Sequence, residues 1–127
     1  MKGAFLISND PRLAEETTTA LAKRGARSSP DGVSQLRDDQ GRLFTFYGQV
    51  EPSQRWEWQD GPHHVEGDGV GPDLATATAC WAECRWEGWL ADLFRALAPE
   101  LSAPAWVLDN NDVLWPADDI DPARISL

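Results

Sequence analysis

Two adjacent histidines, His63 and His64, are the side chains in this sequence best suited to chemistry. Carboxylates surround them at Asp60, Glu66 and Asp68. Imidazole and carboxylate groups bind zinc and other divalent ions. Neighbouring side chains in an extended loop point in opposite directions, however, so two adjacent histidines seldom bind one ion. We therefore interpret the segment as a solvated loop and predict no metal site and no cofactor.

Other signatures of catalysis are missing from the sequence. It contains no GxSxG, HExxH, P-loop or GxGxxG motif. Cys80 and Cys84 match neither the CxxC redox motif nor a zinc-ligand spacing, and we expect two buried free thiols. The polar run at residues 109–112 lacks the ligand pattern of an EF-hand and has the composition of a hairpin turn. The sequence thus predicts that the protein is not an enzyme.

Charge is distributed unevenly along the chain, whose formal net charge is −10. Residues 1–50 contain seven Lys or Arg and six Asp or Glu, whereas residues 51–127 contain four and fifteen. Nucleic acids and anionic membranes bind basic patches, so the acidic second half predicts neither as a partner. It favours a cationic protein surface instead.

Length and hydropathy bound the class of protein. At 127 residues the chain has the size of one domain, which we expect to span residues 1–127. The apolar run near the N-terminus is too short for a signal-peptide core, and no stretch approaches the roughly 20 apolar residues of a membrane span. We expect a cytoplasmic protein.

Several short elements are predicted from local pattern. Five strands are expected where short apolar or alternating runs are bounded by turn formers, at residues 3–8, 33–37, 42–50, 105–109 and 112–115. Asp10 followed by Pro11 predicts the start of a helix over residues 11–24. Residues 51–72 are polar, acidic and rich in Gly and Pro, which predicts a loop.

The longest apolar segment, residues 73–101, is predicted to be the main core helix. At helical spacing its apolar residues fall on two opposite sides, one that includes Trp86 and one that includes Trp81. Either two helical pieces meet near Gly88, or one helix is covered on both faces. The second option requires a partner for Trp81, from this chain or from another.

Together these elements predict an α+β fold. We expect a single domain with a mainly antiparallel sheet and two main helices on one of its faces. The order approximates a ferredoxin-like split βαβ arrangement with an added C-terminal hairpin.

Three tryptophans, Trp56, Trp58 and Trp81, can fill the core or lie at an interface. Residues 55–60 fit either a short strand or an exposed aromatic loop. Exposed aromatic anchors within a polar rim are typical of interface hot spots. The predicted partner-binding surface consists of Trp56, Glu57, Trp58, Asp60, Glu66, Asp68 and Trp81.

The C-terminal stretch AWVLDNNDVLWPADDIDPARISL, residues 105–127, is rich in tryptophan and acids. The chain resembles bacterial immunity proteins in this Trp-rich, acidic C-terminal composition, in its size and in its charge. These neutralise toxin domains, often nucleases whose basic clefts bind nucleic acid. The resemblance implies that the protein binds a cognate protein toxin and inhibits it by covering a basic surface.

Two other functions remain open on the sequence. A small-molecule-binding or enzymatic domain would use the loop at 55–72, with Trp56 and Trp58 as walls and His63 or His64 as acid or base. A structural subunit would instead form a homodimer through Trp81.

Overall fold

One eight-stranded sheet organises the chain in the computed structural model, which describes residues 2–61, 63–67 and 69–127. The strands are β1 (Gly3–Ser8), β2 (Arg27–Ser28), β3 (Ser34–Arg37), β4 (Leu43–Gln49), β5 (His64–Val65), β6 (Thr78–Glu83), β7 (Ala105–Leu108) and β8 (Val113–Pro116). The helices are α1 (Leu13–Lys23), α2 (Trp56–Gln59) and α3 (Glu87–Leu97), with short 3₁₀ turns at Pro52–Gln54 and Ala98–Glu100.

The strand order is β2-β3-β4-β6-β1-β7-β8-β5. All neighbours pair antiparallel except β5 and β8, which are parallel. Strand β1 lies between β6 and β7, and α3 connects these two flanking strands. The predicted α+β class with a mainly antiparallel sheet is confirmed. The ferredoxin-like split βαβ order stays a prediction.

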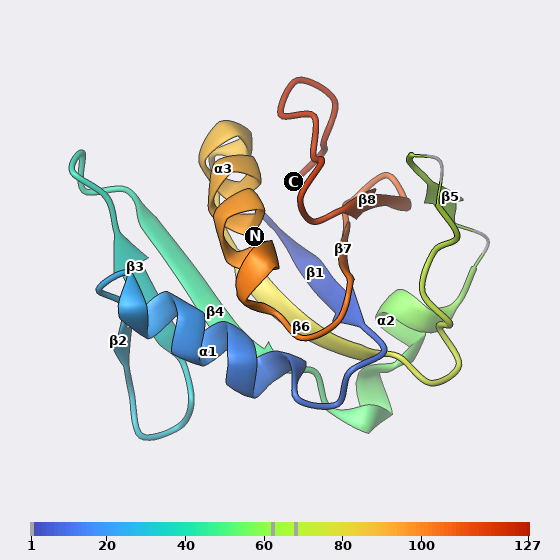
Figure 1. Ribbon diagram of the computed structural model, residues 1–127, viewed down its shortest axis with the longest axis horizontal. Coiled ribbons are helices and arrows are strands. Elements are labelled where there is room, and N and C mark those ends of the chain that lie inside the picture. The colour runs from blue at the N-terminus through green and yellow to red at the C-terminus, as the bar shows by residue number, and fades with distance from the viewer. Residues whose placement is uncertain (1, 62, 68) are drawn as a thin grey trace.

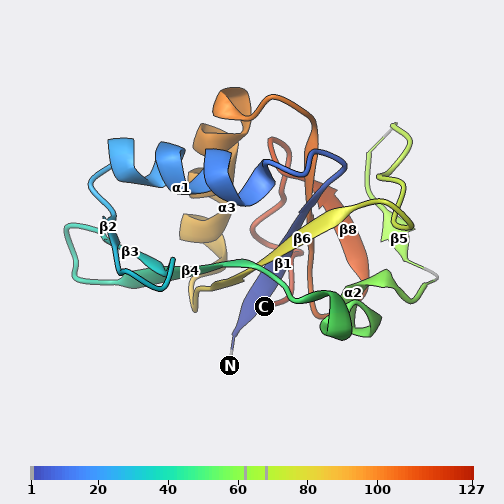
Figure 2. The ribbon, with the colours of Figure 1, turned by 90° about the horizontal axis from the view of Figure 1, so that it is seen from below.

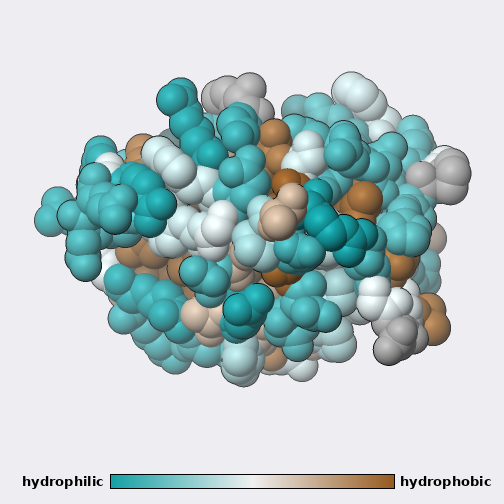
Figure 3. Space-filling model, turned by 90° about the horizontal axis from the view of Figure 1, so that it is seen from above, coloured by the Kyte–Doolittle hydropathy of each residue, from teal (hydrophilic) through white to brown (hydrophobic). Residues whose placement is uncertain are grey.

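Helices α1 and α3 cover one face of the sheet, and the short helix α2 lies on the other side (Figures 1 and 2). The main core fills the space between the sheet and the two long helices. The C-terminal segment after β8 packs into the same core through Ala117, Ile120 and Ile125. Figure 3 shows one side of the molecule, where hydrophilic side chains predominate and apolar ones form small separate areas.

Most of the short elements are confirmed. Strand β1 matches the predicted range, and α1 lies within the predicted range 11–24. The helix begins two residues later than predicted, at Leu13, and its N-cap residue Arg12 makes no side-chain cap. Asp10 forms the turn that precedes the helix, because its carboxylate accepts a hydrogen bond from the Arg12 amide at 2.9 Å and its carbonyl accepts one from the Leu13 amide. Both predicted hairpins form, as β3–β4 and as β7–β8.

The prediction of one core helix over residues 73–101 is wrong in its first half. Strand β6 occupies Thr78–Glu83, and α3 begins only at Glu87. The strand is hard to recognise because Ala79 and Ala82 are small residues with high helix propensity. Neighbouring strands and both sheet faces also bury much of β6, which weakens the alternation of polar and apolar residues. The second half of the prediction is confirmed, since the apolar face of α3 is buried.

The two cysteines are free and buried, as predicted, but they belong to β6 and the residue after it rather than to a helix. Burial raises the pKa of the Cys80 thiol to about 12. A thiol in this environment stays protonated and chemically inert.

Gly3 is required by the packing of β1 against β6. A Cβ atom at this position would collide with the Ala82 carbonyl oxygen and would lie 2.8 Å from the Trp81 indole. We expect Gly3→Ala to lower the free energy of unfolding by about 1–3 kcal/mol, as overpacking does elsewhere. Urea denaturation measures this loss.

The matched control is Gly88→Ala on α3, where an added Cβ meets nothing within 4 Å. Because alanine favours helix over glycine, this variant should be neutral or more stable by up to about 1 kcal/mol. Equal stability of the two variants would contradict the packing described for Gly3.

Candidate functional site

The sheet face opposite α1 and α3 is covered only in part. Helix α2 and the chain around it bury a second, smaller cluster there, which includes Ile7, Trp58 and Leu108. Beside this cluster lies an open groove of about 720 Å³. We call it the aromatic groove, after four of the residues that line it: Phe5, Tyr47, Trp56 and Trp81.

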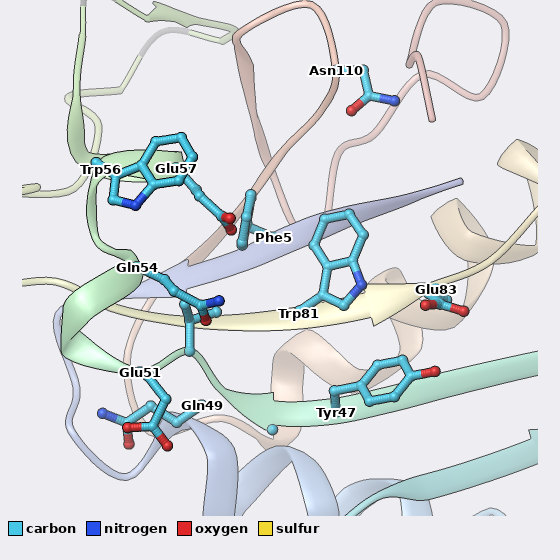
Figure 4. Close-up of a pocket in the computed structure, with 12 residues that line it drawn as sticks. Phe5, Tyr47, Gln49, Glu51, Gln54, Trp56, Glu57, Trp81, Glu83 and Asn110 are labelled. Atoms are coloured by element: carbon cyan, nitrogen blue, oxygen red, sulfur yellow. The ribbon is translucent and has the colours of Figure 1, made fainter. Parts of the chain in front are cut away.

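The floor of the aromatic groove comes from three neighbouring strands. Phe5 on β1 and Trp81 on β6 pack edge to face, with ring centroids 4.8 Å apart and an interplanar angle of 60°. Tyr47 on β4 lies at the rim (Figure 4). Trp81 is half-buried on this face and is not covered by either long helix. It therefore belongs to the site rather than to the main core.

A bulge in β4 positions Tyr47. The pairing register between β4 and β6 shifts between Phe46 and Gly48, and Gly48 has φ of +80°, which glycine adopts without strain. Tyr47 remains 45% exposed as a result. Burial, the negative charge of Glu83 and a hydrogen bond to its carboxylate raise the pKa of the Tyr47 phenol.

Helix α2 supplies one wall of the aromatic groove. Two residues apart on a single turn, Trp56 and Trp58 point in opposite directions. Trp58 is 3% exposed and packs in the second cluster, so Trp56 is directed to solvent and is 66% exposed. In Figure 4 the Glu57 carboxylate extends from α2 toward the space between the Trp56 and Trp81 indoles.

The groove is acidic. Glu51, Glu57 and Glu83 line it, and none of its described lining residues is a lysine or arginine. No ion pair between described residues involves any of the three. The Oε1 atom of Glu83 is buried without a hydrogen-bond partner among the described residues. The groove thus presents uncompensated negative charge beside flat aromatic surface.

The structure brings together three of the seven predicted site residues, Trp56, Glu57 and Trp81. Trp58 is buried, Asp60 is exposed outside the groove, and Asp68 lies outside the described residues. Glu66 is held within the chain by an ion pair with Arg124 at 2.5 Å and one with His64 at 3.3 Å.

The two histidines do not form a joint site. The His63 side chain is buried, with its Nε2 atom 3.0 Å from the Trp58 carbonyl oxygen and its Nδ1 atom 3.5 Å from an Asp112 carboxylate oxygen. His64 points to solvent. Neither histidine lines the groove. The enzymatic alternative required Trp56 and Trp58 as pocket walls beside a histidine acid or base, and the structure does not bring these residues together in the groove. Within the described ranges no group of three or more His, Cys, Asp or Glu could hold a metal ion.

Nine of the described lining residues were not among the predicted site residues, and four of these carry an aromatic or charged side chain: Phe5, Tyr47, Glu51 and Glu83. The alternation of β4 places Tyr47 on the face opposite Phe44 and Phe46, which is a usable signal. Phe5 and Glu83 could be associated with it only after residues 78–83 had been recognised as a strand.

Comparison with known proteins found no matching family model, no matching curated protein and no matching solved structure. Among the residues described, no helix has the length and apolar character needed to cross a membrane.

Proposed function

We propose that this protein is an acidic protein-binding domain of the immunity-protein type, which inhibits a cognate bacterial toxin domain in the cytoplasm. The aromatic groove with its three unpaired carboxylates carries the proposal. Aromatic anchors inside a charged rim are the usual composition of interface hot spots.

The distribution of cations within the chain supports a cationic partner. No ion pair between described residues joins a lysine or arginine to Glu51, Glu57 or Glu83; Lys2, Arg42 and Arg124, for example, pair with acids outside the groove. The groove carboxylates therefore attract positive charge that this chain does not supply to them. A basic toxin cleft is complementary to this surface, and covering the cleft would exclude a phosphate-bearing substrate.

A homodimer through the same groove is disfavoured by charge. A two-fold axis through the groove would bring its own carboxylates close to their copies, and like charges in an interface cost several kcal/mol. Light scattering after gel filtration tests this directly, and we expect a monomer.

The decisive experiment uses the toxin domain encoded beside this gene in the source genome. Co-expression should give a one-to-one complex, restore growth in the presence of the toxin domain, and lose affinity steeply as salt rises. Failure of every adjacent basic toxin domain to bind or to be neutralised would overturn the proposal.

A paired charge variant locates the binding surface. We expect Glu51→Gln with Glu57→Gln to weaken the complex about tenfold and to flatten its salt dependence, because both carboxylates lie in the contact. The control is Asp60→Asn with Asp118→Asn, two exposed acids outside the groove. Both variants change the net charge equally, so equal loss of affinity would mean that overall charge and not the groove determines binding. Calorimetric titration measures both.

A further inference from the structure

We infer that the aromatic groove is a binding site for an arginine side chain of the partner, in which the Trp56 and Trp81 indoles and the Glu57 carboxylate hold the guanidinium. The inference rests on the proposed function and specifies the chemistry of its binding site. Lysine and neutral side chains are the competing occupants.

The chain itself contains two arrangements of this kind. The Arg42 guanidinium lies 5.7 Å from the Trp86 ring centroid and 5.5 Å from that of Trp89, and its Nε atom pairs with Asp38 at 2.5 Å. In this arrangement two indole rings and a carboxylate hold one arginine, which is stabilised by both cation–π attraction and charge pairing.

The second arrangement lies near the C-terminus. The Arg124 guanidinium is 5.1 Å from the Trp115 ring centroid and pairs with Glu66. The aromatic groove has the same components, two indoles and an acid, but no arginine among its described lining residues. The missing component is the one that a partner would supply.

The residue types that line the groove favour guanidinium over ammonium. A guanidinium is planar, stacks on an indole face and donates two parallel hydrogen bonds to a carboxylate, whereas an ammonium is compact and strongly hydrated. Glu83, two residues along β6 from Trp81, also lines the groove and adds negative charge that attracts a cation, although its Oε1 atom is buried. Arginine can use more of these groups at once than lysine can.

The test uses capped tripeptides of sequence Gly-Xaa-Gly, in which Xaa is arginine, lysine or citrulline. Citrulline has nearly the shape of arginine without its charge. The ¹⁵N-labelled full chain has seven tryptophans, each with one indole N–H signal, and Trp56→Phe and Trp81→Phe assign the two of interest. We expect the arginine peptide to shift these two signals with a millimolar dissociation constant at low salt, the lysine peptide to bind about threefold more weakly, and citrulline to leave them unchanged.

Variants locate the carboxylate. Glu57→Gln should weaken arginine binding about fivefold, whereas Asp60→Asn, the same change outside the groove, should not alter it. The inference is overturned if the Trp56 and Trp81 signals do not move, if citrulline moves them equally, or if lysine binds as tightly as arginine.

The outcomes separate this inference from the proposed function. Toxin neutralisation without arginine binding would refute the arginine-binding site and would still support the inhibitor function. Arginine binding without neutralisation of any adjacent toxin domain would support the arginine-binding site and refute the inhibitor function.

Discussion

Replacing Trp56 by alanine is expected to weaken the complex with the toxin domain about 100-fold while leaving the free energy of unfolding unchanged. A tryptophan at the centre of an interface typically contributes more than about 2 kcal/mol to binding when truncated. Its 66% exposure in the free chain means that few intramolecular contacts are lost. Calorimetric titration and urea denaturation of the same samples measure the two quantities.

The matched control for Trp56→Ala is Val70→Ala. Val70 is the most exposed large apolar residue among those described, at 93%, and it does not line the aromatic groove. Removing it should change neither affinity nor stability. A Trp56→Ala variant that binds as tightly as the Val70→Ala variant would show that the groove is not the binding surface.

Local pattern was sufficient to predict the elements whose signals are local. Strand β1 is an apolar run between turn formers, α1 begins at Leu13, two residues after an Asp-Pro pair, and each hairpin is marked by the composition of its turn. These signals come from backbone preferences over a few residues, which tertiary contacts do not reverse here.

Strand β6 could not be predicted in the same way because its identity is decided by its neighbours. The segment with Ala79, Cys80 and Ala82 is compatible with a helix on propensity alone. It becomes a strand because β1 and β4 supply hydrogen bonds on both sides. Small side chains also suit a central strand that the two long helices cover.

The candidate site was predicted in part for a related reason. Trp56, Glu57 and Trp81 were identified from residue type, as aromatics near acids. Trp81 lies some 25 residues after Trp56 and Glu57 in the sequence, and the groove also includes residues of β1 and β4. These other members could not be associated with the site from the sequence. The opposite directions of Trp56 and Trp58 follow from the single turn of α2, which replaced the predicted strand or loop.

The second large effect is expected for Asp109→Asn, which tests the hairpin that the polar run at 109–112 forms. Asp109 is 6% exposed. Its Oδ1 atom accepts hydrogen bonds from the Asn111 and Val113 amides at 2.8 and 3.1 Å. Its Oδ2 atom accepts one from the Trp115 indole at 3.0 Å and one from the Ser126 amide at 3.1 Å. One carboxylate thus joins the turn, strand β8 and the C-terminal segment.

An asparagine at position 109 keeps the shape but replaces one accepting oxygen by an amino group. With the amide oxygen retained at the turn, the amino group would face the Trp115 and Ser126 donors, which would both lose their acceptor. Leaving buried donors unsatisfied costs about 1–3 kcal/mol each, so we expect the free energy of unfolding to fall by about 2–4 kcal/mol. Urea denaturation followed by tryptophan fluorescence measures it.

The control for this change is Asp112→Asn in the same turn. Asp112 has φ of +59°, a conformation that asparagine tolerates well, and its side chain is 73% exposed. The two variants make the same chemical change three residues apart, but of the two carboxylates only that of Asp109 accepts hydrogen bonds from described residues. The Asp112 carboxylate lies 3.5 Å from His63 Nδ1, a contact that the oxygen of an asparagine can keep. We expect Asp112→Asn to change stability by less than about 0.5 kcal/mol. If both variants unfold at the same denaturant concentration, the Asp109 carboxylate does not hold the C-terminal segment against the hairpin.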